Sequence, residues 1–124
     1  MAVWWQGRLL VVRPSYRSGY DLPGGGLDAG EEPRHGALRE LMEELALEIP
    51  PAELQELGQF EFVLDHRRIS ETLFAWHPQA EPALRIDRRE IVWAGFAAPA
   101  TLAEALVTTS VRHALESPPA LTIS

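Results

Sequence analysis

Residues 22–47 read LPGGGLDAGEEPRHGALRELMEELAL, and the character of the chain changes within this stretch. Three consecutive glycines, Gly24 to Gly26, form neither a stable strand nor a helix interior, because glycine loses more backbone freedom on ordering than any other residue. Such a segment is kept where the backbone turns sharply or comes close to a ligand. We therefore predict a loop at 24–26, followed by a helix over 31–47.

The predicted helix has the start, the apolar spacing and the stop of an amphipathic segment. Pro33 suits the first turn, where its missing N–H is not needed, and the two preceding glutamates suit the positive end of the helix dipole. Pro50-Pro51 ends the element. Apolar residues recur every three to four positions and form the expected core face: Ala37, Leu38, Leu41, Met42 and Leu45.

Three glutamates share one face of this helix. Glu40, Glu43 and Glu44 stand at positions i, i+3 and i+4, and Arg39 is spaced to pair with Glu43. Carboxylates beside a loop whose backbone can approach a phosphate favour a hard divalent cation such as Mg²⁺. These residues indicate metal-assisted attack of water on phosphorus, because a bound ion polarises the phosphate and lowers the pKa of its water.

Outside this stretch the pattern predicts a frame of β-strands and a C-terminal helix. Strands are expected at 8–13, 57–64, 69–76 and 91–97, with a short strand and tight turn before residue 8 and a charged turn at 65–68. Thr101 and Glu104 resemble a capping box that opens the helix, and the β-branched run 107–109 predicts a break in it. Pro118-Pro119 ends it, and its expected inward residues are Leu102, Leu106, Val111 and Leu115.

Composition excludes several classes of protein. The 124 residues suffice for a single domain, 1–124, and the absence of cysteine excludes disulfide frameworks, thiolate zinc sites and cysteine nucleophiles. No apolar run approaches the roughly 18 residues of a membrane span, and the N-terminus lacks the pattern of a signal peptide, so a cytoplasmic protein without a membrane partner is expected. A formal charge of −7, with no lysine, argues against nucleic acid as a partner.

The spacing of these residues resembles the signature box of the Nudix hydrolases, here residues 25–47. Aliphatic residues at 41 and 47 and the lead-in at 22–25 agree with it. Six fixed residue identities of the box are also matched, and a chance match at all six is expected on the order of once in ten million windows, so the motif is specific. The six matching identities are Gly25, Glu31, Arg39, Glu40, Glu43 and Glu44.

The resemblance implies an α/β fold, an α/β/α sandwich with a mixed β-sheet. It also implies Mg²⁺-dependent (or Mn²⁺-dependent) hydrolysis of a nucleoside diphosphate linked to another moiety. Carried over by position, Glu40, Glu43 and Glu44 would be metal ligands, with the Gly24 carbonyl near the ion. A homodimer is a further implication, because many relatives are dimers.

Supporting roles follow from the same resemblance. Arg39 would orient Glu40 or Glu43, and Glu31 would fix the loop against the helix. A further glutamate from outside the box would act as ligand or base; Glu90 is the first candidate and Glu81 the second.

Ala46 departs from the box, which has glycine at that position. A left-handed residue ending the helix there costs alanine about 1 kcal/mol. The alternative is a helix that runs on to Ile49.

Substrate contacts are less sharply indicated. Guanidinium groups suit bidentate phosphate binding, and those of Arg13, Arg17, Arg67 and Arg68 could hold substrate phosphates. The glycines 24–26 with Arg13 and Arg67 are the first candidate substrate-binding groups. In the family that the motif resembles, ADP-ribose hydrolases carry a proline about fifteen residues past the box; positions 60–64 here contain none, and the resemblance therefore counts against that substrate. A nucleoside triphosphate, a nucleotide sugar or another dinucleotide remains open, as does a catalytically silent nucleotide-sensing or partner-binding domain.

Overall fold

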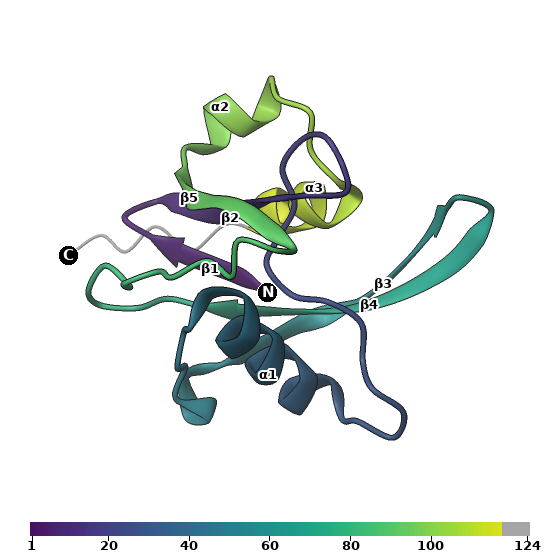
Figure 1. Ribbon diagram of the computed structural model, residues 1–124, viewed down its shortest axis with the longest axis horizontal. Coiled ribbons are helices and arrows are strands. Elements are labelled where there is room, and N and C mark those ends of the chain that lie inside the picture. The colour runs from purple at the N-terminus through teal and green to yellow at the C-terminus, as the bar shows by residue number, and fades with distance from the viewer. Residues whose placement is uncertain (118–124) are drawn as a thin grey trace.

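Five strands form one mixed sheet in the computed structural model, which describes residues 1–117 (Figure 1). The sheet order is β3-β4-β1-β2-β5, with β1 and β4 parallel and every other neighbouring pair antiparallel. The predicted strands are thereby confirmed. Their bounds are β1 Ala2–Trp5, β2 Arg8–Pro14, β3 Gln55–Leu64, β4 Arg67–Trp76 and β5 Ile91–Ala97.

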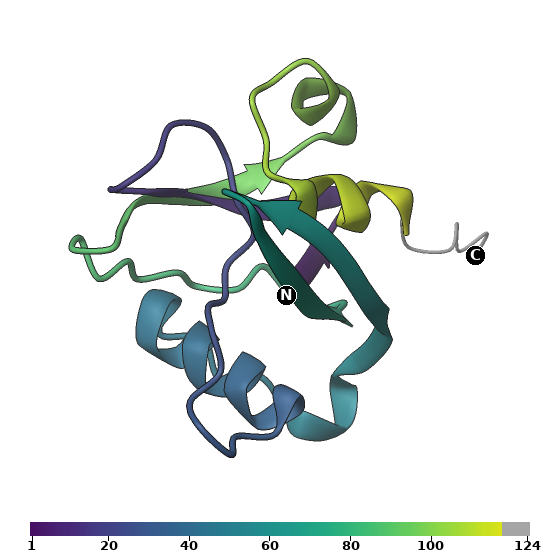
Figure 2. The same cartoon turned by 90° about the vertical axis from the view of Figure 1, so that its right-hand side faces the viewer.

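Helices cover both faces of the sheet. Helix α1, Pro33–Leu45, lies on one face with the short 3₁₀ helix η1, Pro51–Glu53, after it. Helices α2, Pro99–Ala103, and α3, Thr109–Glu116, lie on the other face (Figure 2). The α/β/α sandwich implied by the sequence is confirmed. None of the helices among residues 1–117 combines the length and apolar character needed to cross a membrane.

Alternation along the central strands separates two cores. Val3 and Leu10 pack on the α1 side with Leu41 and Leu45. Their chain neighbours point to the opposite face, where Trp4 packs with residues of α2 and α3. This period of two fixes the register, because a slip by one residue would exchange the two faces.

Two hairpin turns hold the strands in place. Gln6 and Gly7 join β1 to β2, and Asp65 and His66 join β3 to β4; all four have positive φ, as in the mirror-image turns that suit the twist of hairpins. The second turn is therefore two residues long rather than four. It leaves the β3–β4 hairpin long enough to project beyond the rest of the fold (Figure 1).

The predicted break in the C-terminal helix is confirmed, because α2 and α3 are separate helices. Two expectations about this segment are wrong. Thr101 lies inside α2, and the capping residue is Thr108, whose hydroxyl accepts from the Val111 N–H at 3.4 Å. Leu106 does not point inward, because the break leaves it in the connection, 67% exposed. The predicted stop at Pro118-Pro119 lies outside the described residues.

Met42 is also 41% exposed, against expectation. Helix α1 turns Glu44 inward beside Leu41 and Leu45, so the buried stripe is rotated away from Met42.

The end of α1 distinguishes between the two possibilities for Ala46. The helix stops at Leu45, and Ala46 adopts the left-handed conformation with φ 55° and ψ 34°. Its N–H donates to the Met42 carbonyl at 3.0 Å, and the Leu47 N–H donates to the Leu41 carbonyl at 3.3 Å. An alanine therefore occupies a backbone conformation that favours glycine.

Candidate active site

Arg39 connects the glycine loop to the carboxylates of α1. Its guanidinium donates to both oxygens of Glu31, at 2.7 and 2.8 Å, and also to Glu40 at 3.0 Å and Glu43 at 3.1 Å. It further donates to the Gly26 carbonyl at 3.3 Å. The hydrogen bonds from Arg39, together with one from the Asp28 N–H, lower the pKa of Glu31 to about 2. Bidentate contacts of this kind hold both partners in one geometry.

Two glycines allow the loop and the helix to come this close. A Cβ on Gly25 would lie 2.9 Å from the carboxyl carbon of Glu40. A Cβ on Gly36, inside α1, would collide with Leu27 and lie 2.9 Å from Glu31 Oε1. Sequence reasoning missed Gly36; the signal for it is a glycine in a helix interior, where alanine is favoured by about 1 kcal/mol.

Glu44 is a buried carboxylate, only 6% exposed. Its Oε2 accepts from the Gly24 N–H at 2.8 Å. Burial raises the pKa of Glu44 to about 7; the Gly24 bond opposes this shift, and the charges of Glu40 and Glu90 add to it. Burial also raises the pKa of Glu40, against the opposing effect of Arg39 and with that of Glu43 and Glu90. The negative charges of Glu40, Glu44 and Glu90 thus act on one another beside the glycine loop.

Glu43 and Glu90 take different positions relative to this spot. The Glu43 side chain is 59% exposed and bonds to Arg39, so it is turned away from Glu44. Glu90 directly precedes β5, and its charge acts on both Glu40 and Glu44. The other candidate, Glu81, is exposed in the connection between β4 and β5.

The donor set suits a hard divalent cation. Glu40 and Glu44 are oxygen donors whose mutual repulsion and burial a cation would offset, and carboxylates are preferred ligands of Mg²⁺. Among residues 1–117 no three acidic or histidine side chains already form a complete metal-binding cluster. Glu43 would have to turn from Arg39 to reach a cation held by Glu40 and Glu44.

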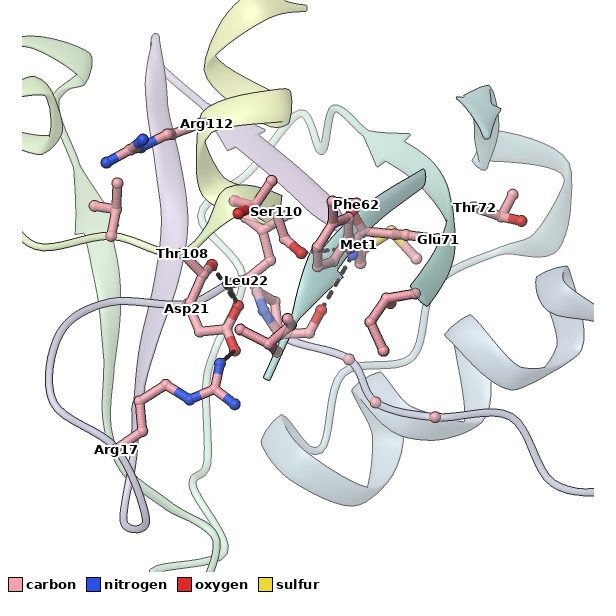
Figure 3. Close-up of a pocket in the computed structure, with 18 of the residues that line it drawn as sticks. Met1, Arg17, Asp21, Leu22, Phe62, Glu71, Thr72, Thr108, Ser110 and Arg112 are labelled. Atoms are coloured by element: carbon pink, nitrogen blue, oxygen red, sulfur yellow. Dashed lines mark hydrogen bonds and ion pairs between the residues drawn. The ribbon is translucent and has the colours of Figure 1, made fainter. Parts of the chain in front are cut away.

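A cavity of about 740 Å³ adjoins the glycine loop (Figure 3). It lies between loop residues 16–27, the β3–β4 hairpin and the start of α3. On the loop side, Asp21 accepts from the Thr108 hydroxyl at 2.8 Å and lies 3.6 Å from Arg17. On the hairpin side, the Ser110 hydroxyl donates to Glu71 at 2.6 Å. The volume is within the range of small-molecule sites.

The predicted substrate-binding groups divide into two sets. The glycines 24–26 line the cavity, whereas neither Arg13 nor Arg67 is among the described residues that line it. The Arg13 guanidinium carbon lies 6.0 Å from the centre of the Tyr20 ring, and Arg67 is exposed at the start of β4. The guanidinium groups that do line the cavity belong to Arg17 and Arg112.

Several cavity residues escaped sequence reasoning: Asp21, Glu71, Thr108, Ser110 and Arg112. No local pattern marks them, because they come from three separate segments that only the tertiary fold brings together.

The sequence of this chain matches a known protein family. The NUDIX domain family matches this chain over residues 3–115. No curated protein sequence matches the chain.

Solved structures share the fold at low sequence identity. A MutT NUDIX hydrolase from Burkholderia pseudomallei superposes with a TM-score of 0.79 at 22% identity, covering 93% of this chain and 91% of its own. The E. coli dihydroneopterin triphosphate pyrophosphohydrolase gives 0.79 at 19% identity, covering 94% and 89%. The NUDIX domain of Shewanella oneidensis NrtR, complexed with ADP ribose, gives 0.79 at 16% identity, covering 93% and 80%.

Proposed function

Because this chain belongs to the Nudix family, we propose that it is a Mg²⁺-dependent hydrolase of pyrophosphate bonds that acts on nucleotides. Its substrate is a nucleoside diphosphate linked to another moiety, such as a nucleoside triphosphate or a nucleotide sugar. One observation carries the proposal: the buried Glu44 carboxylate accepts a hydrogen bond from the Gly24 N–H and feels the charges of Glu40 and Glu90.

Glu40, Glu43, Glu44 and the Gly24 carbonyl would hold the ion, with Mn²⁺ as an alternative to Mg²⁺. When bound, such a cation polarises the phosphate and lowers the pKa of a coordinated water. The Gly24 N–H holds Glu44 in place, while Arg39 holds Glu40 and keeps Glu43 within reach. Arg39 is thus a positioning residue, and Glu31 in turn positions Arg39.

Glu90 is the proposed general base. It lies outside the box helix, and its charge already acts on Glu40 and Glu44. Its carboxylate would accept the proton of the attacking water as the water oxygen bonds to phosphorus and the pyrophosphate P–O bond breaks.

The backbone of residues 24–26 would face the substrate phosphates, since these glycines line the cavity. Arg13 and Arg67 would contact only a substrate that extends beyond the cavity. We propose that the enzyme acts in the cytoplasm on a free small molecule; no helix among residues 1–117 is long and apolar enough to cross a membrane.

The test is product release from nucleoside triphosphates, ADP-ribose, nucleotide sugars and dinucleoside polyphosphates, with Mg²⁺ and with EDTA. Glu44→Gln keeps an acceptor for the Gly24 N–H but removes the charge, and it is expected to lower turnover by at least about 100-fold. Glu48→Gln, at an exposed position after α1, is the matched control and is expected to behave as wild type.

Thermal unfolding with and without Mg²⁺ gives a second readout that does not depend on turnover. Mg²⁺ is expected to raise the Tm of the wild type but not of Glu44→Gln, because a ligand that binds only the folded state stabilises it. Unchanged turnover in Glu44→Gln contradicts the ligand role. Nucleotide binding without turnover across the panel would instead favour the silent sensing domain.

A further inference from the structure

The cavity wall opposite the glycine loop carries a second, separate carboxylate. Glu71 lies on β4 beside Met1, and Ser110 approaches it from the start of α3 (Figure 3). The Ser110 hydroxyl donates to Glu71 Oε1 at 2.6 Å, and the Glu71 side chain is 22% exposed. Both residues line the cavity. This carboxylate is therefore held by a protein donor while part of it still faces the cavity.

His113 of α3 packs behind the carboxylate. Its Nδ1 lies 3.7 Å from Glu71 Oε2, and neither atom has a hydrogen-bond partner among residues 1–117. The His113 ring stacks on Phe60 with centroids 4.3 Å apart, and it meets Phe62 edge-on at 6.1 Å. Oε2 is thus enclosed by α3, and Oε1 is the oxygen available to a molecule in the cavity.

In the described part of the chain, two other carboxylates line the cavity, Asp21 and Asp65, and Asp65 lies in the turn at the tip of the β3–β4 hairpin, away from Ser110 and Met1. Asp21 is already engaged by the Thr108 hydroxyl and the Leu22 N–H, both at 2.8 Å, and by Arg17. The ammonium group of Met1 donates to the Pro23 carbonyl at 3.1 Å. Oε1 of Glu71 accepts a single bond from the described residues, and a carboxylate oxygen can accept more than one.

Apolar side chains lie near this acceptor. Leu22 and Phe62 line the same cavity, and Phe62 lies on the same face of the sheet as Glu71, where the two apolar side chains give a slot that suits a flat heterocycle. An acceptor at the edge of such a slot discriminates by chemistry. It pairs with an N–H group and repels a carbonyl oxygen placed at the same point.

We propose that Glu71 selects nucleotides whose base carries an amino group, namely adenine, cytosine and guanine, over uracil and thymine. An exocyclic amino group can donate to Glu71 Oε1. The single ring N–H of uracil or thymine is flanked by two carbonyl oxygens, which the carboxylate repels. Ser110 and His113 position the carboxylate. The inference rests on the proposed function, which places a nucleoside in this cavity.

The experiment measures binding without turnover. Titration calorimetry in EDTA compares AMP, CMP and GMP with UMP and TMP for the wild-type chain. The amino-bearing nucleotides are expected to bind at least about 10-fold more tightly, as a hydrogen bond to a charged group allows. Equal Kd values for all five nucleotides, or no binding of any of them, overturn the inference.

Glu71→Gln tests the residue itself. Glutamine keeps an acceptor but adds an amide donor that can pair with a uracil carbonyl, so the preference is expected to fall to about 3-fold or less. Glu61→Gln, exposed on β3 and outside the set of cavity-lining residues, is the matched control and is expected to keep the wild-type preference. An unchanged preference in Glu71→Gln overturns the assignment.

A second variant covers the case in which Glu71→Gln does not fold. Ser110→Ala removes the donor to Oε1 and is expected to weaken the base preference without abolishing binding. A full preference in Ser110→Ala overturns the positioning role. Turnover of the five triphosphates with Mg²⁺ is scored separately. A base preference in binding without any hydrolysis would contradict the proposed function and leave the inference standing.

Discussion

Two carboxylate clusters flank the glycine loop and are built in different ways: the box wall, which is the loop and α1 with Glu31, Glu40, Glu43 and Glu44, and the opposite wall, which is the side of the cavity that carries Glu71. On the box wall, Arg39 bonds to three glutamates and the Gly24 N–H holds the fourth. On the opposite wall, Glu71 Oε2 and His113 Nδ1 face each other without a hydrogen bond among residues 1–117. The box wall comes from one continuous stretch of chain, whereas the opposite wall joins β4 to α3. The first is largely held in place before substrate arrives, with Glu43 left to turn toward a cation, and on the second Oε1 of Glu71 retains capacity to accept another bond.

From this difference we expect the box wall to determine the rate of turnover and the opposite wall to determine which nucleobase is preferred. A wall whose carboxylates are mostly held by its own bonds suits chemistry that is common to every substrate, because preorganised groups need little rearrangement during reaction. A wall with spare acceptor capacity suits recognition of one substrate among several. Changes on the box wall should therefore alter turnover equally for all bases, and changes at Glu71 should alter the ratio between bases.

Gly25→Ala should break the box wall with the largest effect. The added methyl would lie 2.9 Å from the Glu40 carboxyl carbon and push that carboxylate away, while the exposed loop and the fold persist. Displacement of a catalytic group by about 1 Å can cost on the order of 100-fold, so kcat should fall by that order for every base alike.

Gly26→Ala is the matched control, because a Cβ there meets nothing within 4 Å. Its kcat should stay close to that of the wild type. A loss of the same size in both variants, or a loss confined to one base in Gly25→Ala, would contradict the division between the two walls.

Gly36→Ala should destabilise the joint between the loop and α1. The methyl would collide with Leu27 and approach Glu31, which outweighs the better helix propensity of alanine, for a net loss of about 1–2 kcal/mol. Urea unfolding measures this loss. The double variant Leu27→Ala/Gly36→Ala should recover most of it, since Leu27 is half exposed and is what the methyl meets. No recovery in the double variant would locate the strain elsewhere.

Acid should weaken the box wall through Glu31. Its pKa is about 2 in the folded chain and near 4.5 when unfolded, so the folded state favours the ionised form. This contribution to stability is fully present above pH 4.5 and is lost as the pH falls toward 2. Urea unfolding between pH 6 and pH 2.5 should show a steeper loss for the wild type than for Glu31→Gln. Parallel slopes for the two proteins would show that Arg39 does not hold Glu31 in solution.

The box wall was largely predictable from the sequence and the opposite wall was not. Helical periodicity placed Glu40, Glu43 and Glu44 on α1, and a spacing of four predicted the Arg39–Glu43 pair, which forms at 3.1 Å. These relations are local, so the chain itself determines them. Ser110 meets Glu71 only after α3 docks on the hairpin, and neither residue type carries a local signal of that contact. Met42 shows the limit even within α1, because the burial of Glu44 rotates a stripe that hydrophobic spacing alone predicted differently.

The smallest expected effect is at Ala46, directly after α1, where substitution should increase the stability of the chain instead of decreasing it. Ala46 holds φ 55° at an exposed position, a conformation that costs alanine but not glycine. Ala46→Gly should therefore stabilise the chain by about 0.5–1 kcal/mol, even though glycine is more flexible when unfolded. Ala52→Gly, in the exposed 3₁₀ helix η1, lacks a positive φ and should destabilise slightly in the same urea assay. Because Ala46 contributes only backbone geometry, kcat should not change. A gain in stability with altered turnover would mean that the strained end of α1 is coupled to Glu44, and that the box wall is less rigid than its bonds indicate.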